Sequence, residues 1–140
     1  MSTTIKPVLS TKNPYYISKH RYYELKHFCL QYPEWRKELE QLYLEPGSLN
    51  MNYIKSSIPS DRTSEIAMRR IKLQTKMKLV EQAALAADPG LANYILVAVT
   101  DGVNYEFLRM RMNIPCCRDT FYECYRKFFK VLSDSQNLHV

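Results

Sequence analysis

The chain has 140 residues, of which 46% are hydrophobic and 24% charged, and its formal net charge is +6. This length and composition suit one globular domain with a core of its own and argue against a wholly disordered chain. The longest apolar runs fall well short of the roughly 20 residues that a membrane span needs, and the four cysteines include no CxxC pair. We therefore expect a cytoplasmic protein with reduced thiols and no membrane segment.

The first third of the chain predicts a flexible arm, two helices and a linker. Residues 1–14 are polar and contain two prolines, which is typical of an arm. Apolar side chains then recur at steps of three and four over 15–44, and Pro33 interrupts them. Because proline disfavours helix just before it, we expect an N-terminal helical hairpin over 15–44. Residues 45–61 are rich in Pro, Gly, Ser and Asn and predict a linker.

Residues 62–134 predict a helical domain, with a frayed tail over 135–140. With only three glycines and long Leu-, Met-, Ala-, Lys- and Glu-rich segments, the expected fold class is all-α, a helical bundle. A long helix should span about 63–87, followed by a mostly apolar helix and then two closing helices. Apolar positions of the long helix alternate steps of four and three, which suits either an antiparallel hairpin or a self-associating coil that forms a homodimer. These positions are Leu73, Met77, Val80, Ala84 and Ala87.

The long helix also carries a cluster of positive charge. Six basic residues lie between Arg62 and Lys78 against one acidic residue, Glu65. Such a cluster can neutralise DNA phosphates, although a solvated helix face is the usual alternative. The predicted phosphate contacts are Arg69, Arg70, Lys72 and Lys76.

The closing helices, within residues 104–132, predict a helix-turn-helix. Phe121, Tyr125, Phe128 and Leu132 advance by four, three and four, which makes one apolar stripe on the last helix. A DNA-reading helix needs such a buried side and a polar, basic side for the major groove. The predicted DNA contacts on that other side are Arg118, Tyr122, Glu123, Arg126, Lys127 and Lys130. The alternative is that these are the last two helices of an ordinary bundle.

The segment DGVNYEFLRMRMNIP resembles the start of the helix-turn-helix in sigma-factor region 4 and in the sigma-like late-gene activators of phages, the ArpU/RinA kind. The matching positions are Gly102, Asn104, Tyr105, Leu108, Ile114 and Pro115. Aligning Thr120 and Phe121 with the family's Thr-Val requires two extra residues, Cys116 and Cys117. More broadly, most of the chain is similar to small regulator-like proteins carried by prophages of Gram-positive bacteria. The resemblance implies double-stranded DNA and RNA polymerase as partners.

These observations predict a phage or prophage transcription regulator that binds specific double-stranded DNA through its C-terminal helix-turn-helix. In this interpretation the N-terminal hairpin binds RNA polymerase or another host protein. The alternative is a protein-binding adaptor or inhibitor that disables a host or defence protein, such as a nucleic-acid-guided nuclease (anti-CRISPR-like). We expect no catalysis and no cofactor, because the sequence has no phosphate-binding glycine loop, HExxH or GxSxG. We also expect no metal, because the cysteines and histidines lack paired-ligand spacing.

Overall fold

The computed structural model describes residues 13–44 and 61–138, and all regular structure in those ranges is helical, which confirms the all-α class. The helices are α1 (Lys19–Leu30), α2 (Tyr32–Leu44), α3 (Asp61–Ala87), α4 (Ala92–Asp101), α5 (Tyr105–Met112) and α6 (Arg118–Leu138). Most of the predicted arm, nearly all of the predicted linker and the last two residues of the predicted tail lie outside the described residues.

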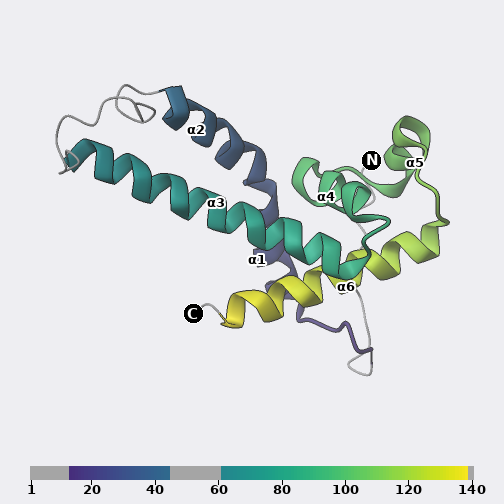
Figure 1. Cartoon of the computed structure of the whole chain (residues 1–140). Helices are drawn as coiled ribbons and strands as arrows, with labels where there is room; N and C mark the ends of the chain where they lie inside the picture. The colour runs from purple at the N-terminus through teal and green to yellow at the C-terminus, as the bar shows by residue number, and fades with distance from the viewer. Residues whose placement is uncertain (1–12, 45–60, 139–140) are drawn as a thin grey trace.

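The first two helices form a kinked helix instead of the expected hairpin. Only Gln31 separates α1 from α2, and its φ of −79° and ψ of −11° are helical. The Trp35 N–H donates to the Gln31 carbonyl at 3.0 Å, which continues the helical bonding pattern across the junction. Pro33 falls in the first turn of α2, where a missing N–H is tolerated. The chain therefore bends at this point without reversing, and α1 and α2 follow one another end to end (Figure 1).

The antiparallel hairpin of this protein is made by α2 and α3 (Figure 1). Near the start of α2, the Tyr32 hydroxyl bonds to the carboxylate of Glu81. Further along α2, the Glu38 carboxylate accepts three bonds from the Arg69 guanidinium group, two on one oxygen and one on the other, at 2.8–3.1 Å. Residue numbers rise along α2 as they fall along α3, so the two helices run in opposite directions.

The predicted apolar stripe of α3 lies inside the protein. Leu73 and Val80 are fully buried, and Ala84 and Ala87 are 1% and 6% exposed. These side chains face a layer made by α2, α4 and α6, against which α3 packs. The expectation of a self-associating coil through this stripe is therefore wrong, since the residues are already occupied within the chain.

The centre of the protein is the aromatic side of α6. Phe121, Phe128 and Leu132 are fully buried, as the sequence predicts, and Phe129 is buried beside them. From α1, the Tyr22 ring packs edge-on against Phe129, with ring centroids 5.0 Å apart. Buried residues from α1, α2, α3, α4, α5 and α6 form one continuous hydrophobic cluster. The N-terminal helices are thus part of the main body, and the predicted division at 45–61 does not separate two cores.

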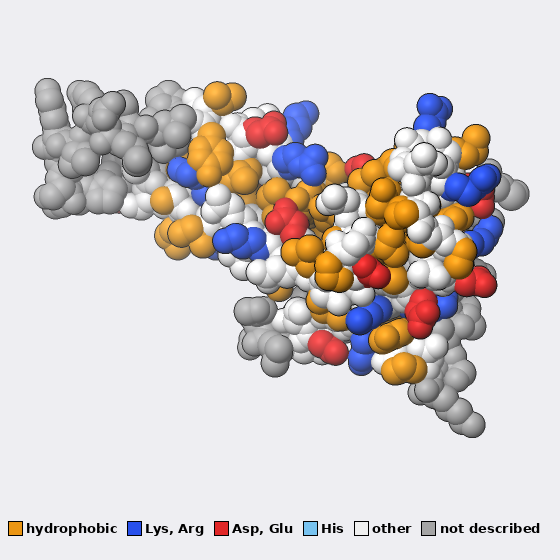
Figure 2. All heavy atoms as spheres, turned by 45° about the vertical axis from the view of Figure 1, so that its right-hand side comes forward, with side chains coloured by type: hydrophobic (Ala, Val, Ile, Leu, Met, Phe, Trp, Pro, Cys, Tyr) orange, Lys and Arg blue, Asp and Glu red, His pale blue; other side chains and the backbone are white. Residues whose placement is uncertain are grey.

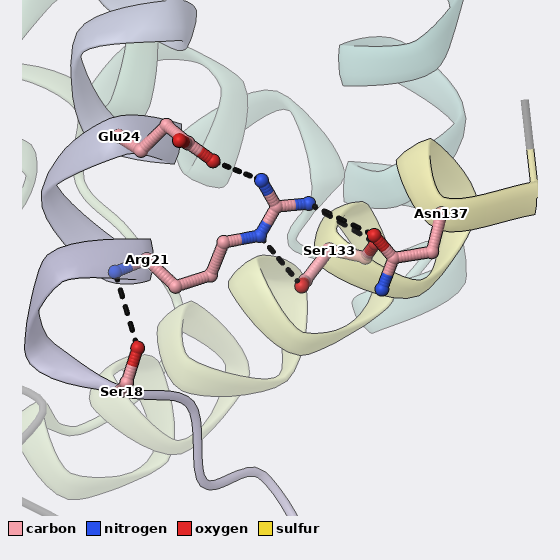
Figure 3. Close-up of polar contacts among 5 residues, drawn as sticks. All are labelled: Ser18, Arg21, Glu24, Ser133 and Asn137. Atoms are coloured by element: carbon pink, nitrogen blue, oxygen red, sulfur yellow. Dashed lines mark hydrogen bonds and ion pairs between the residues drawn. The ribbon is translucent and has the colours of Figure 1, made fainter. Parts of the chain in front are cut away.

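Helix α6 continues to residue 138, well past its predicted end near 132. The guanidinium group of Arg21 on α1 bridges the two helices here (Figure 3). It donates from Nε to Ser133 Oγ at 3.0 Å and from one terminal nitrogen to Asn137 Oδ1 at 3.5 Å, while Glu24 pairs with its other side. The predicted tail is therefore wrong for residues 135–138, because contacts with α1 hold this last part of α6 in place.

A buried hydroxyl pair joins α1 to α6. The oxygens of Tyr22 and Tyr125 lie 2.8 Å apart, and burial raises the pKa of both phenols. Both hydroxyls are therefore protonated at neutral pH, and one donates to the other.

We expect Tyr22→Phe to lower the free energy of unfolding by about 1–3 kcal/mol, because it removes the hydrogen-bond partner of the buried Tyr125 hydroxyl. Adding Tyr125→Phe removes that hydroxyl too, so the double variant should regain part of the loss. Urea denaturation followed by circular dichroism measures both values. A double variant with a lower free energy of unfolding than Tyr22→Phe alone would contradict this account.

Candidate nucleic-acid interface

The entry into α5 is fixed by the residues that carry the sigma-like pattern. Gly102 ends α4 with a φ of +71°, and its N–H donates to the Ala98 carbonyl at 3.0 Å. The Asn104 side chain then caps α5 by accepting from the Phe107 N–H at 3.0 Å. Glycine suits the left-handed conformation and asparagine suits a helix N-cap. Gly102 and Asn104 therefore occupy their positions in the sigma-like pattern because they cap helices.

The turn between α5 and α6 is fixed by a buried isoleucine and two hydrogen bonds. Asn113 ends α5 in the left-handed region, with φ 57° and ψ 46°, and the next residue, Ile114, is buried. The Ile114 N–H donates to the Leu108 carbonyl at 3.3 Å, and the Tyr105 hydroxyl donates to the Cys116 carbonyl at 2.6 Å. Five residues, 113–117, separate the helices. DNA-reading units typically use three or four, so this turn is longer than usual.

Helix α5 is tied to the start of α6 by aromatic packing. The Tyr105 ring lies 5.8 Å from Phe121 and 6.3 Å from Tyr122, measured between centroids. Leu108, one turn further along α5, is fully buried. The short helix, the turn and the N-terminal half of α6 thus share one core, as a helix-turn-helix requires.

Tyr122 does not lie on the outer side of α6 and is only 8% exposed. Its ring packs against Tyr105, Phe121 and Tyr125. The sequence pattern predicts a narrow buried stripe, but the Tyr105 ring of α5 packs against Tyr122 and widens the buried side of α6. The prediction that Tyr122 faces DNA is therefore wrong.

Arg118 is exposed at the start of α6, but other side chains already hold it. Its guanidinium group lies 5.4 Å from the centre of the Tyr122 ring and 3.5 Å from a carboxylate oxygen of Glu106 on α5. The other oxygen of Glu106 lies 3.4 Å from Arg109. One carboxylate thus bridges two arginines across the two helices of the unit.

Along the rest of α6, basic and acidic residues share the outer side. Arg126, Lys127 and Lys130 are half-buried, and Lys130 lies 3.6 Å from Asp134. Glu123 is exposed, as predicted. With α5 brought toward the viewer, Figure 2 likewise shows basic and acidic side chains interspersed with hydrophobic ones. The outer side of α6 is therefore mixed in charge, and is less basic than the predicted cationic flank.

Three of the four predicted phosphate contacts on α3 already contact side chains of α2. Arg69 forms an ion pair with Glu38. The Arg70 guanidinium group lies 4.0 Å from the centre of the Tyr43 ring, and the Lys76 ammonium group lies 5.6 Å from the centre of the Trp35 ring. Lys72 is exposed. These cations hold α2 on α3, and the pair extends to one side of the body, away from α5 and the start of α6 (Figure 1). The predicted cluster is therefore not continuous with the helix-turn-helix.

The exposed side of α5 carries large apolar and basic side chains that are not among the predicted DNA contacts. Phe107 and Met110 are 42% and 76% exposed, and Arg109 and Arg111 are exposed beside them. The sequence holds a signal for this side, because burying positions 105, 108 and 112 of an eight-residue helix leaves 107, 110 and 111 outside. The surface formed by α5 is thus both apolar and basic.

The turn also contains a thiol that differs from the other three. Cys117 is exposed, and its sulfur lies 3.2 Å from the Thr120 hydroxyl, a hydrogen bond that lowers the pKa of the thiol. Burial instead raises the pKa of Cys29, Cys116 and Cys124. Cys117 is therefore the most readily ionised cysteine of the chain.

Neither a metal site nor a membrane span is found in the part of the chain that the structure describes. Over residues 13–44 and 61–138, no three His, Cys, Asp or Glu side chains are grouped so that they could hold a metal ion. In the same ranges no helix combines the length and apolar character needed to cross a bilayer.

Comparison of the chain with protein-family models, curated proteins and solved structures finds no match.

We expect Cys117 to react with iodoacetamide before the other cysteines at neutral pH, because the thiolate is the attacking species. Thr120→Val removes the stabilising hydroxyl, so it should raise the pKa of Cys117 and slow its alkylation. Peptide mapping by mass spectrometry after short exposures gives the order of reaction. Cys29 serves as the internal control, since it should react only in denaturant. Faster alkylation of Cys116 or Cys124 would contradict the assignment.

Proposed function

We propose that the protein is a double-stranded-DNA-binding transcription regulator of a phage or prophage, acting through α5, the turn and α6. One observation carries the proposal. A short helix, a left-handed asparagine, a buried isoleucine and a long second helix pack on one shared aromatic core, and the start of the second helix is open to solvent. Helix-turn-helix proteins present the first turns of their second helix to the major groove in this way.

In this proposal the beginning of α6 reads bases. Arg118 donates to guanine, and the Glu123 carboxylate accepts from cytosine, which are common pairings in the major groove. Arg126, Lys127 and Lys130 then contact phosphates. Because acidic residues lie among these cations, affinity rests on a few individual contacts rather than on a broad positive field.

A second candidate function, binding to another protein, is favoured by α5. Phe107 and Met110 are large and exposed on a helix that also carries two exposed arginines. A DNA reader does not need an apolar patch at this place, whereas a protein interface does. The candidate includes both RNA polymerase and a host or defence protein as partners. A protein that fails to bind any duplex at low salt, but is properly folded, would favour this second function.

We expect Arg126→Ala with Lys130→Ala to weaken duplex binding and to reduce the slope of log affinity against log salt by about 2, because each lost phosphate contact removes roughly 0.9. Fluorescence anisotropy over a salt series measures both quantities. The matched control is Lys19→Ala with Lys37→Ala, which removes the same charge from exposed positions of α1 and α2. Equal weakening by the two double variants would show that only overall charge matters, and an unchanged affinity for the first would contradict the proposal.

We expect Glu106→Gln to strengthen duplex binding by a factor of several, because it releases Arg109 and Arg118 from a shared carboxylate and removes a negative charge near the phosphates. The same anisotropy titration, with the salt slope as a second readout, measures the effect. Glu40→Gln, on the exposed side of α2, is the control for loss of one acidic charge. Weaker binding by Glu106→Gln would mean that the carboxylate positions Arg118 for DNA instead of competing with it.

A further inference from the structure

The turn between α5 and α6 ends in two adjacent cysteines, Cys116 and Cys117. Cys117 is exposed, Cys116 is half-buried, and both are free thiols. The peptide bond that joins them lies between the two helices, after Met112 ends α5 and before Arg118 begins α6. Helix α6 therefore starts directly after a pair of thiols that covalent geometry keeps close together.

The two thiols differ in the way that stepwise oxidation requires. Hydrogen bonds from the Thr120 hydroxyl and from the backbone of Thr120 and Asp119 lower the pKa of Cys117, which favours its nucleophilic thiolate form. Burial raises the pKa of Cys116, which therefore remains a thiol at neutral pH. An accessible cysteine with a lowered pKa beside a second thiol is the usual arrangement of a redox sensor.

We propose that Cys116 and Cys117 form a redox switch, in which a peroxide joins them in a disulfide and a small thiol separates them again. The switch acts on the turn that holds α5 against the start of α6. Its chemistry depends on the two thiols alone, and only its effect on DNA rests on the proposed function.

The oxidation takes place in two steps. The Cys117 thiolate attacks one oxygen of hydrogen peroxide, the O–O bond breaks, and the departing hydroxide takes a proton from solvent to become water. The Cys116 sulfur then attacks the sulfur of the resulting sulfenic acid. As the S–S bond forms, the S–O bond breaks, and the released hydroxide takes the Cys116 proton to become a second water. The pair of sulfurs gives up two electrons, which reduce the peroxide.

A disulfide between adjacent residues is strained, which suits a reversible switch. Neighbouring Cα atoms lie about 3.8 Å apart, whereas most disulfides span roughly 4.4–6.8 Å between Cα atoms. Strained and exposed disulfides are the ones that are readily reduced. A small thiol such as glutathione should therefore restore both cysteines and be oxidised to its own disulfide.

Closing this ring changes a contact that fixes the turn. The Cys116 carbonyl belongs to the peptide bond inside the ring, and it accepts from the Tyr105 hydroxyl at 2.6 Å. The small ring forces that peptide bond away from its ordinary planar geometry, so the carbonyl turns away from Tyr105. The link from α5 to the turn is then lost, directly before Arg118 at the start of α6.

Peptide mapping of the full chain after treatment with hydrogen peroxide tests the pairing. Remaining thiols are alkylated in denaturant, and trypsin cuts after Arg111 and Arg118, which leaves Cys116 and Cys117 in one peptide and Cys124 in the next. We expect the shared peptide to lose two hydrogen atoms and escape alkylation, and glutathione to restore both thiols. A covalent link to the peptide with Cys124 would overturn the proposal, as would thiols that stay unpaired.

Hydrogen exchange of the α5 amides tests the structural effect. Oxidation should speed this exchange about fivefold, as expected from the loss of one hydrogen bond. Cys116→Ser cannot form the disulfide and should show no response to peroxide. Cys124→Ser is the matched control, since this thiol lies outside the turn, and it should respond like the unchanged protein. Tyr105→Phe lacks the same bond and should exchange at the faster rate without oxidation. Equal exchange in the oxidised and reduced protein would overturn the switch.

Fluorescence anisotropy with duplex DNA separates this inference from the proposed function. Displacement of Arg118 should make the oxidised protein bind about tenfold more weakly, and glutathione should restore the affinity. Equal affinity in the two states would overturn the switch as a control of binding. If neither state binds any duplex while the disulfide still forms and speeds exchange in α5, the proposed function fails and the switch is supported.

Discussion

The structure depends on the burial of the aromatic side of α6. Phe121, Tyr125, Phe128 and Phe129 are all buried, and α1, α3 and α4 pack against α6 from different directions. Aromatic side chains bury large areas, so this one helix contributes much of the hydrophobic stabilisation. Because three helices surround it, only a limited outer strip of α6 remains for a ligand. The same packing that stabilises the fold therefore restricts which residues can act at the surface.

That restriction limits which residues can contact DNA in the proposed function. The cations of α3 that the sequence assigns to phosphates are largely engaged with α2, and those of α6 lie among carboxylates. A basic composition thus does not become a continuous basic surface. The proposed contacts therefore rest on the α5–α6 unit itself, where the carboxylate of Glu106 lies 3.4 Å from Arg109 and 3.5 Å from Arg118 and would compete with DNA for both. Specificity from a few well-placed groups fits such a surface better than affinity from general attraction.

Local signals were enough to predict the helical class and the inner stripe of α6, because both depend on neighbours within one or two turns. Features set by distant contacts could not be predicted in this way. The chain was expected to reverse direction at Pro33, but it only bends there, since proline alone does not determine the direction of the next helix. Tyr122 is buried because the Tyr105 ring of α5 packs against it, and α6 extends past 132 because Arg21 of α1 contacts its last turns.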